Sequence, residues 1–545
     1  MFFNFAVHNQ SIQLKVIIMK IALIAPPYPL EEAPSPPLGV AYVAAACERA
    51  GAEVRIFDYI VRKYTPEKLA KEMAEFKPDA IGTTSVTMNY KKAASILQTA
   101  KQINPSVVTL FGGPHVSFDW ANTLKDYPGT DIVVIGEAEQ TLSELVPVLK
   151  NRESWKDIKG IAYLEDGNIK KTEERPLMDD IEDLPLPSRH LLPMSRYQAL
   201  GFPVSIITSR GCPNKCIFCL GRKMVGFKVR HRSTAHVVDE IQDILTYGID
   251  FINIADDLFT ANKKRVVEFC EELKKRQLKF QWSAFARVNT VDYETLKIMK
   301  EAGCHAVSFG IESGNTDMLT RVRKGITLDQ ARKAVTACKE AGVTAHASFL
   351  AGLPGESLQS MEDSDRFSKE LDILYGYHFL APFPGTTVRE KIEEYDLEIL
   401  SDDWDLYDAD NVIVRTSHLE PDQIKAFVNQ ATIKVKQEWD ELEKRFKDKT
   451  LNDAEYMQVG GFHRMEMIYK ILSEDIVEEY GTQPGDFEQA LTGLAEVLAR
   501  ETGMEPDFTR FHFNDLVTKG YIACQENKDN VRFFWTHSKK KAVFA

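Results

Sequence analysis

Short apolar runs alternate with amphipathic stretches from Lys20 onward, and this alternation constrains the fold more than any other feature. The first series of runs is KIALIAP, EVRIFD, AIGTTSV, VVTLFGG and DIVVIGE, separated by helical stretches such as GVAYVAAACERAG. Strands that alternate with helices in this way form a parallel sheet covered by helices. Residues 19–150 are therefore predicted to form a Rossmann-like doubly wound α/β domain. Its ligand is expected at the carboxyl ends of the strands.

A second series of the same kind begins at Val204 with VSIITS, FINIAD, QWSAFA, AVSFG, TAHASFLAG and YHFLAPF. Six strand–helix units predict a TIM-like partial (β/α)6 barrel over residues 196–398, with its chemistry at the carboxyl ends of the strands. The predicted fold class is thus α/β throughout these two domains. An N-terminal extension (1–18), a proline-rich linker with a small hairpin (151–195) and a mainly helical C-terminal domain (399–545) complete the predicted organisation.

Charge and composition exclude several classes of protein. The chain of 545 residues is too long for one hydrophobic core. A net charge of −13 argues against nucleic acid as a partner.

No apolar stretch approaches the roughly 20 residues that span a bilayer, so no integral membrane association is expected. The first residues lack the pattern of a secretory signal, which leaves open a start at Met1 or at Met19. Five of the eight cysteines are scattered and look like small buried hydrophobic residues, which favours a cytoplasmic location.

Three of the eight cysteines, Cys212, Cys216 and Cys219, are crowded into SRGCPNKCIFC, directly after the first strand of the second series. A structural zinc site closes with four ligands, and neither a fourth cysteine nor a histidine pair follows at zinc-finger spacing. Three thiolates instead leave one iron of a [4Fe–4S] cluster without a protein ligand, and that iron can chelate a small molecule. Because thiolates suit both zinc and iron–sulfur sites, the position on the catalytic face of a barrel favours the cluster.

This C-x3-C-x2-C spacing resembles that of the radical S-adenosylmethionine (SAM) superfamily, whose clusters bind SAM through its amino and carboxylate groups. The resemblance covers about residues 20–390 and extends to ADDLFT, FARVN, FGIESG and LAGLPGES at successive strand ends. It implies an acid near the SAM ammonium, an arginine for its carboxylate and glycines that allow close backbone approach. The implied SAM contacts are Phe218, Asp256, Asp257, Arg287, Glu312, Ser313, Gly352 and Pro354.

A doubly wound domain before such a barrel, with PPLG early and GGPH late, looks like the cobalamin-binding branch of this superfamily. The usual D-x-H-x-x-G signature is missing, so the resemblance implies a base-off cobalamin without that histidine. His115 is a candidate either for direct cobalt ligation or for a bond to a backbone group or to the periphery of the cofactor. A Rossmann-type nucleotide site is disfavoured, since no G-x-G-x-x-G follows the first strand. The implied cobalamin contacts are Pro27, Leu38, Gly39, Thr84, Ser85, Gly112, Gly113, His115, Gly136 and Glu137.

The resemblance implies a class B type radical SAM C-methyltransferase that uses a [4Fe–4S] cluster, SAM and cobalamin. Such an enzyme forms a 5′-deoxyadenosyl radical, methylates an unactivated carbon through methylcobalamin and needs an electron donor such as ferredoxin or flavodoxin. One alternative is an enzyme like the anaerobic Mg-protoporphyrin IX monomethyl ester oxidative cyclase, which adds an oxygen and a ring instead of a methyl group. Another is a corrinoid-binding or sensory protein with a structural cluster, which production of 5′-deoxyadenosine would exclude.

The methyl acceptor is the least determined part of the prediction. It is a peptide, a protein or a small molecule. The size of the C-terminal tail slightly favours a peptide or protein side chain, such as glutamine or arginine of methyl-coenzyme M reductase. Tyr375, Tyr377 and His378 near the sixth strand are candidates to face the substrate, and packing is an equally good interpretation for them.

Overall fold

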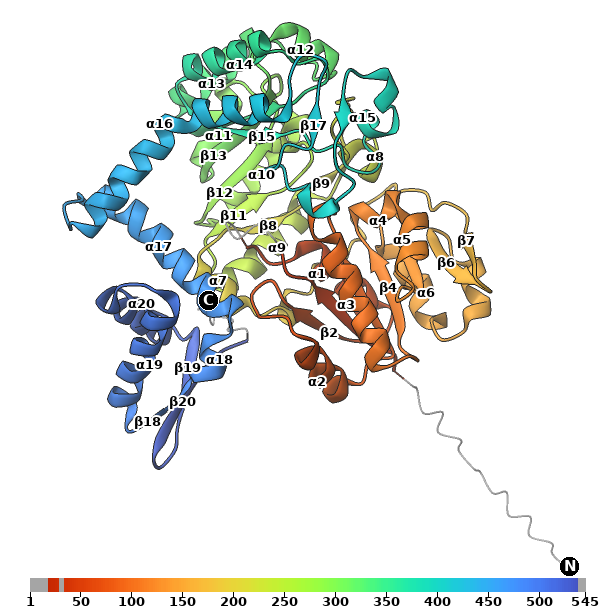
Figure 1. Ribbon diagram of the computed structural model, residues 1–545, viewed down its shortest axis with the longest axis vertical. Helices are drawn as coiled ribbons and strands as arrows, with labels where there is room; N and C mark the ends of the chain where they lie inside the picture. The colour runs from red at the N-terminus through yellow and green to blue at the C-terminus, as the bar shows by residue number, and fades with distance from the viewer. Residues whose placement is uncertain (1–17, 29–33, 538–545) are drawn as a thin grey trace, which may run out of the picture.

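The computed structural model describes residues 18–28 and 34–537, so nearly all of the expected N-terminal extension lies outside the described residues. Two α/β units lie side by side, and a C-terminal region follows them along one side (Figure 1). Among the described residues, no helix combines the length and apolar character needed to cross a bilayer.

The first unit is built on a seven-stranded sheet with the order β2-β1-β3-β4-β5-β6-β7. Its first five strands are parallel, as the alternation predicts: β1 (Lys20–Ala25), β2 (Glu53–Asp58), β3 (Ala80–Thr84), β4 (Val108–Gly112) and β5 (Ile132–Val134). Separate apolar clusters form on its two faces, as in a doubly wound sheet. The helices are α1 (Leu38–Arg49), α2 (Pro66–Phe76), α3 (Tyr90–Ile103), α4 (Pro114–Phe118), α5 (Trp120–Asp126) and α6 (Glu139–Leu145).

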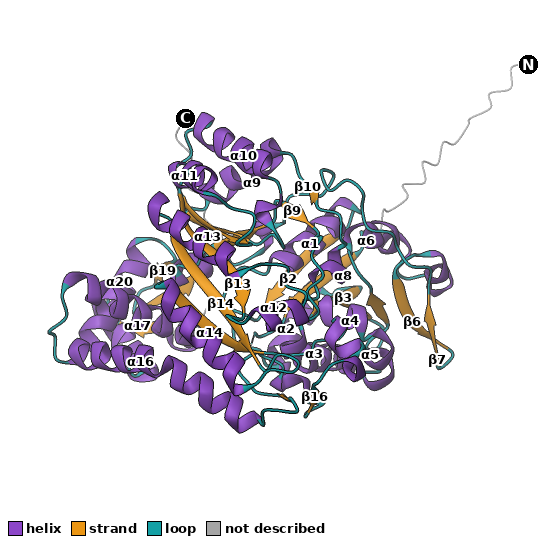
Figure 2. Cartoon of the chain, turned by 90° about the horizontal axis from the view of Figure 1, so that it is seen from above, coloured by secondary structure: helices purple, strands orange, loops and turns teal. Residues whose placement is uncertain are grey.

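The hairpin in the expected linker belongs to this sheet. Strand β6 (Ile161–Glu165) pairs antiparallel with β5, and β7 (Asn168–Lys171) pairs with β6. Figure 2 shows β6 and β7 at the outer edge of the sheet. Ile161 and Ala162 are fully buried there, because the hairpin covers an edge that would otherwise be open. The first sheet thus extends beyond residue 150, where the sequence places its boundary.

The second unit is a six-stranded parallel sheet with the sequential order β8-β11-β12-β13-β14-β15, which confirms the partial barrel. Its strands are β8 (Val204–Ile206), β11 (Phe251–Ile254), β12 (Gln281–Ala286), β13 (Cys304–Glu312), β14 (Thr344–Ala351) and β15 (Leu374–Phe379). Its helices are α9 (Thr234–Thr246), α10 (Lys263–Lys275), α11 (Tyr293–Glu301), α12 (Thr316–Arg321), α13 (Leu328–Ala341) and α14 (Leu358–Leu371).

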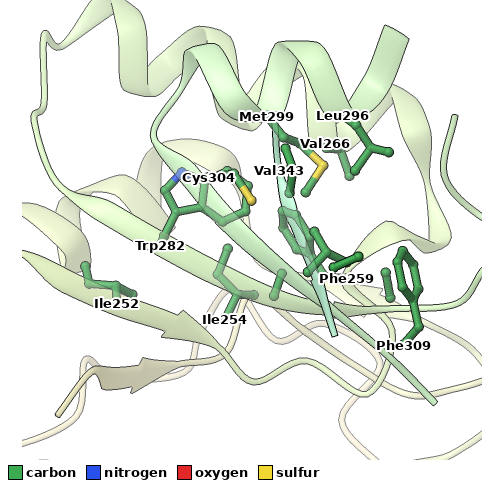
Figure 3. Packing of buried hydrophobic residues seen from close by; sticks show 14 of the residues in the cluster. Ile252, Ile254, Phe259, Val266, Trp282, Leu296, Met299, Cys304, Phe309 and Val343 are labelled. Atoms are coloured by element: carbon green, nitrogen blue, oxygen red, sulfur yellow. The ribbon is translucent and has the colours of Figure 1, made fainter. Parts of the chain in front are cut away.

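The core of the barrel lies between its strands and the outer helices (Figure 3). Trp282 meets Phe259 and Phe269 edge to face, with centroid distances of 5.7 and 5.6 Å. Its indole N–H donates to the Ala302 carbonyl at 2.8 Å. A buried tryptophan is tolerated here because this polar atom has a partner.

After β15 the chain returns to the first unit, and we call residues 380–416 the strap. Within the strap lie α15 (Thr387–Glu390), β16 (Glu398–Ile399), the 3-10 turn Trp404–Leu406 and β17 (Val414–Arg415). Trp404 packs edge to face on His115, with 4.9 Å between the ring centroids. Lys91 of α3 pairs with Asp403 and Asp405 of the strap. The strap therefore joins the barrel to helices α3 and α4 of the first unit.

The C-terminal region is mainly helical, as expected, and adds a three-stranded antiparallel sheet with the order β18-β20-β19. One apolar cluster joins this region to Val61 of the first unit and to α7 (Met194–Leu200), the helix that precedes the barrel. Its elements are α16 (Pro421–Lys447), α17 (Asp453–Ser473), α18 (Ile476–Tyr480), β18 (Thr482–Pro484), α19 (Phe487–Thr502), α20 (Pro506–Thr518), β19 (Ile522–Glu526) and β20 (Asn530–Trp535).

Candidate cofactor site

The three crowded cysteines lie in a loop between two short strands, β9 (Ser209–Arg210) and β10 (Arg230–His231), which pair antiparallel. The N–H of Cys212 donates to the Gly226 carbonyl at 3.0 Å, and that of Ile217 donates to Val322 at 3.2 Å. Gly211 has a φ of +111°, and a Cβ at this position would overlap the carbonyl of Lys228. The loop therefore requires a glycine immediately before its first cysteine.

The thiols of this loop interact with one another electrostatically. Desolvation, followed by the charges of Cys216, Cys212 and Asp257, raises the pKa of Cys219 to about 11. Arg287 places a guanidinium nitrogen 3.7 Å from the sulfur of Cys216, where it offsets negative charge. Among the described residues, no three His, Cys, Asp or Glu side chains already converge on a point suited to one ion. A cubane does not require such convergence, because each thiolate binds a different iron, so this donor set fits a [4Fe–4S] cluster.

Both aspartates after β11 support the cysteine loop. Asp256 is buried and accepts four hydrogen bonds, two from the backbone N–H groups and two from the hydroxyls of Thr208 and Ser209. Desolvation raises the pKa of Asp256, and these bonds oppose the shift. Asp257 accepts from the N–H of Gly211 at 3.3 Å. The oxygens of Asp256 are therefore already engaged, and Asp257 lies beside the cysteines.

Arg287, Glu312 and Phe218 are linked through Lys324, a residue that the sequence analysis missed. Arg287 donates to the carbonyl of Lys324, and the Lys324 ammonium lies 2.7 Å from Glu312 and 6.0 Å from the ring centroid of Phe218. Glu312 has a φ of +72° where the β13–β14 register shifts. Such strain in a non-glycine residue is typical of functional sites. The basic stretch RVRKGIT, soon after FGIESG, is the sequence signal that points to Lys324.

The other implied SAM contacts have local structural partners. Ser313 is fully buried and accepts from the N–H of Asn315 at 3.1 Å. Gly352, with a φ of +85°, donates its N–H to Glu356 at 2.6 Å. Pro354 is buried in the same turn. The sequence analysis missed Glu356, whose complete burial raises its pKa to about 8.

Three adjoining cavities lie at the carboxyl ends of the strands of the first sheet. One of about 240 Å³ enters between the strands and α1, and one of about 420 Å³ shares Gly39 and Thr84 with it. The third, of about 540 Å³, reaches α8 (Gly221–Val225) of the cysteine loop and shares Met224 with the first. A still larger cavity of about 830 Å³ lies at the opposite edge of the sheet, where Lys150 pairs with Asp79.

Most of the implied cobalamin contacts line these cavities: Gly39, Thr84, Ser85, Gly112, Gly113, Gly136 and Glu137. The hydroxyl of Ser85 is buried and makes no hydrogen bond within the described chain, which suits a polar group on a ligand. A Cβ on Gly113, which has a φ of +105°, would lie 2.5 Å from the Ser85 carbonyl. Pro27 and Leu38 do not line the cavities. The arrangement fits a large amphipathic ligand with a tail inserted beside the sheet.

His115 lies behind the cavities and lines none of them. Its Nδ1 is 3.2 Å from the Thr87 hydroxyl, and its Nε2 is 3.6 Å from Asp119. The ring stacks on Tyr90, with 3.9 Å between centroids, and Trp404 covers its other side. Burial lowers the pKa of His115. These contacts disfavour cobalt ligation, because the ring is enclosed between Tyr90 and Trp404 under the strap, and a bond to a backbone group or to the cofactor periphery stays a prediction.

Two carboxylates of the first unit hold two arginines of the cysteine hairpin. Glu137 accepts from both terminal nitrogens of Arg230 at 2.7 and 2.9 Å and lies 3.3 Å from Arg210, which also pairs with Glu139. Burial alone would raise the pKa of Glu137, but Arg230 and Arg210 outweigh it, so the pKa is lowered. Glu139, Arg210 and Arg230 were not singled out from the sequence, because their ion-pair partners are remote in sequence.

The candidate substrate residues lie on opposite faces of β15. Tyr375 and Tyr377 pack on Phe349, with centroid distances of 6.3 and 5.5 Å, and Tyr377 also meets Phe427 of α16. These contacts favour the packing interpretation for both tyrosines. His378 points to the opposite side of the strand and is exposed.

Comparison with known proteins agrees with this geometry. The B12 binding domain model matches residues 32–146, and the Radical SAM superfamily model matches residues 206–368. The chain is 37% identical to the uncharacterized methyltransferase PH0819 of Pyrococcus horikoshii, over 76% of this chain and 92% of that relative. It is 30% identical to the anaerobic magnesium-protoporphyrin IX monomethyl ester cyclase of Rubrivivax gelatinosus, over 67% and 68% of the two chains.

Among solved structures, the cobalamin-dependent SAM radical enzyme OxsB with aqua-cobalamin and SAM bound has the same fold. It superimposes with a TM-score of 0.66 at 19% identity, over 94% of this chain and 82% of OxsB. The cysteine loop, the cavities over the first sheet and the 37% identity to PH0819 point to one conclusion. The chain belongs to the family of cobalamin-binding radical SAM methyltransferases.

Proposed function

We propose that this chain is a C-methyltransferase, which transfers a methyl group to an unactivated carbon. The observation that carries the proposal is that the two cofactor sites adjoin. Arg210, two residues before Cys212, lines the cavity of about 240 Å³, and Met224 of the cysteine loop lines both that cavity and its larger neighbour. The residues that would hold the cluster and the residues that would hold cobalamin therefore line a shared space.

When bound, the cluster with SAM supplies a carbon radical, and cobalamin supplies the methyl group. The residues of this chain bind and orient these groups. Cys212, Cys216 and Cys219 would hold the cluster, and Arg287 offsets the charge of the thiolates. The Glu312–Lys324 pair presents a fixed carboxylate beside Phe218. The strap contacts the first unit at His115 and Lys91 and the cysteine loop at Lys223, so it helps to fix the two units relative to each other.

A cyclase-like activity is the second candidate, and the 30% identity to the R. gelatinosus enzyme favours it over other radical reactions. It differs in the product, which gains oxygen and a ring. A corrinoid-binding or sensory protein is a weaker candidate, because it would not need the strained Glu312 or the buried Lys324 beside the cysteine loop.

The proposed acceptor site is the inner face of the barrel. Phe285, Ser308, His346 and Leu374 stand in register across β12 to β15, on the face opposite the apolar core. Phe285 lies near the carboxyl end of β12 and is 49% exposed, although it is large and apolar. Leu374 is 67% exposed but begins β15, so it lies at the amino end of that strand. An exposed apolar side chain such as Phe285 suits a substrate with an apolar part. We retain a peptide or protein side chain as the proposed acceptor because of the large C-terminal region, with a small molecule as the alternative.

The proposal includes two further expectations from the sequence. A ferredoxin or flavodoxin would reduce the cluster. A cytoplasmic location is proposed because the described cysteines are all free thiols.

The test needs no known acceptor. The protein is reconstituted anaerobically with iron, sulfide and cobalamin, mixed with methyl-deuterated SAM and a strong reductant, and analysed by mass spectrometry. We expect labelled methylcobalamin and 5′-deoxyadenosine, and we expect Cys212→Ala to remove the latter. If 5′-deoxyadenosine forms without labelled methylcobalamin, the methyltransferase assignment fails and the cyclase-like reaction becomes the better one.

A further inference from the structure

The segment around the cysteines has an unusual charge for this chain. Between Ser209 and Arg232 there are seven arginines and lysines and no acid, whereas the whole chain has a net charge of −13. Three of these cations pair with carboxylates: Arg230 and Arg232 are buried, and Arg210 is partly buried. A fourth, Lys223, pairs with Glu390 of the strap.

The other three cations, Lys215, Arg222 and Lys228, make no ion pair within the described chain, and Lys215 and Lys228 are exposed. Phe227 stands beside Lys228 and is 68% exposed. We call Lys215, Arg222, Phe227 and Lys228 the basic face. It includes part of α8, which lies beside α15 at the side of the molecule opposite α16 and α17 (Figure 1).

The residues of the basic face all belong to the cysteine loop between β9 and β10. The residue before Phe227, Gly226, accepts the N–H of Cys212, and the carbonyl of Lys228, the residue after it, lies against Gly211. Phe227 thus stands between two residues whose backbone contacts Cys212 and Gly211. The neighbouring segment 173–183 is acidic and contacts Gly226 through Leu177, so an acidic segment borders the basic face.

We propose that the basic face docks an acidic one-electron carrier protein, which reduces the cluster. This inference rests on the proposed function, because it requires a cluster on the three cysteines. One electron leaves the reduced carrier and enters the cluster, so the carrier is oxidised by one electron and the cluster is reduced by one. No proton or chemical group crosses the interface.

The composition of the face suits this class of partner. Complexes for electron transfer bury little surface and dissociate readily, so a few unpaired cations around one aromatic anchor are sufficient. Opposite charges steer the encounter and raise the association rate, and they act most strongly at low salt. The acidic remainder of this chain would repel the same carrier elsewhere, which directs it to the basic face.

The test compares two reductants on the reconstituted enzyme. Cluster reduction is followed by stopped-flow absorbance with an acidic flavodoxin in its hydroquinone form, or with titanium(III) citrate, which needs no docking site. The variants are Phe227→Ala and the double variant Lys215→Glu/Lys228→Glu. The matched controls are Phe511→Ala, at a phenylalanine of α20 that is 69% exposed, and Lys528→Glu in the exposed β19–β20 turn.

With flavodoxin, we expect the second-order rate of both docking variants to fall about tenfold or more, and the salt dependence of the double variant to flatten. The controls should match the wild type, and titanium(III) citrate should reduce every variant equally fast. Binding of the flavodoxin to the cluster-free chain, measured by surface plasmon resonance, should weaken in the same variants.

Three results would overturn the inference. Unchanged flavodoxin rates and binding would mean that the carrier docks elsewhere. Equal losses with both reductants would mean that the substitutions damage the loop instead of a docking surface. Equal losses in the matched controls would mean that contact is unspecific. Failure of the proposed function is distinguishable from all three, because the wild type would then hold no iron and sulfide or would form no 5′-deoxyadenosine with titanium(III) citrate.

Discussion

Glu137 and Arg230 form a two-point ion pair, with nitrogen–oxygen distances of 2.7 and 2.9 Å, that joins the cavity wall of the first unit to the hairpin of the cysteine loop. Glu137 lines two of the cavities, and Arg230 lies in the strand that closes the hairpin. The pair therefore sets the position of one cofactor site relative to the other.

Arg230→Met should destabilise the apo protein by about 3–5 kcal/mol, because it leaves Glu137 buried without its main partner. Chemical denaturation measures this loss. The matched control is Lys159→Met, which breaks an exposed pair with Glu173 and should cost under about 1 kcal/mol. Since the pKa of Glu137 is lowered, its contribution is present above the ordinary carboxyl range and is lost as the pH falls through the folded pKa. A loss equal to that of the control would show that the pair carries no structural energy.

Gly211→Ala should prevent stable assembly of the cluster. An alanine at a φ of +111° costs about 1–3 kcal/mol in backbone strain, and its Cβ would push the hairpin carbonyl of Lys228 away. Iron and sulfide content after reconstitution is the measurement. Gly461→Ala is the control, since a Cβ there meets nothing within 4 Å and should favour helix α17. Normal iron content in Gly211→Ala would contradict the tight closure of the loop.

Lys324→Met should weaken SAM binding about tenfold or more, which corresponds to about 1.4 kcal/mol. The physical reason is that Glu312 loses its buried partner and its fixed orientation. Equilibrium binding of SAM to the reconstituted protein tests this expectation. Lys333→Met, which removes an exposed pair with Asp329 on α13, should bind SAM as the wild type does. Unchanged affinity in Lys324→Met would remove the Glu312–Lys324 pair from the SAM site.

Glu356 should make the stability of the apo protein depend on pH between about 4.5 and 8. Its pKa is raised from 4.5 to about 8 by burial, so the folded state holds a proton that the unfolded state releases in this range. The stabilisation is complete below the unfolded pKa and is lost as the pH rises through the folded pKa. Glu356→Gln keeps an oxygen for the N–H groups of Gly352 and Leu353 and should flatten the pH profile of the melting temperature. Identical profiles for the two proteins would show that Glu356 does not titrate in this window.

The sequence by itself determined the two parallel sheets and the cysteine site, because the signals for both are local. Strand and helix periodicity extends over a few residues, and the three cysteines lie within one loop. The same holds for Thr84 and Gly113 at the strand ends and for Gly39 at the start of α1, which line the cavities as expected.

Only the tertiary structure decided what the isolated polar and aromatic residues do, because their partners are remote in sequence. His115 packs under Trp404, 289 residues away, and this contact argues against the cobalt role that its motif also allows. Arg230 finds Glu137 at a separation of 93 residues, and Lys324 meets Glu312 only because a loop folds back beside the strand end. The face of β15 that Tyr375 and Tyr377 occupy depends on helices packed against it. Burial and pairing of this kind are properties of the assembled fold, and no short stretch of sequence contains them.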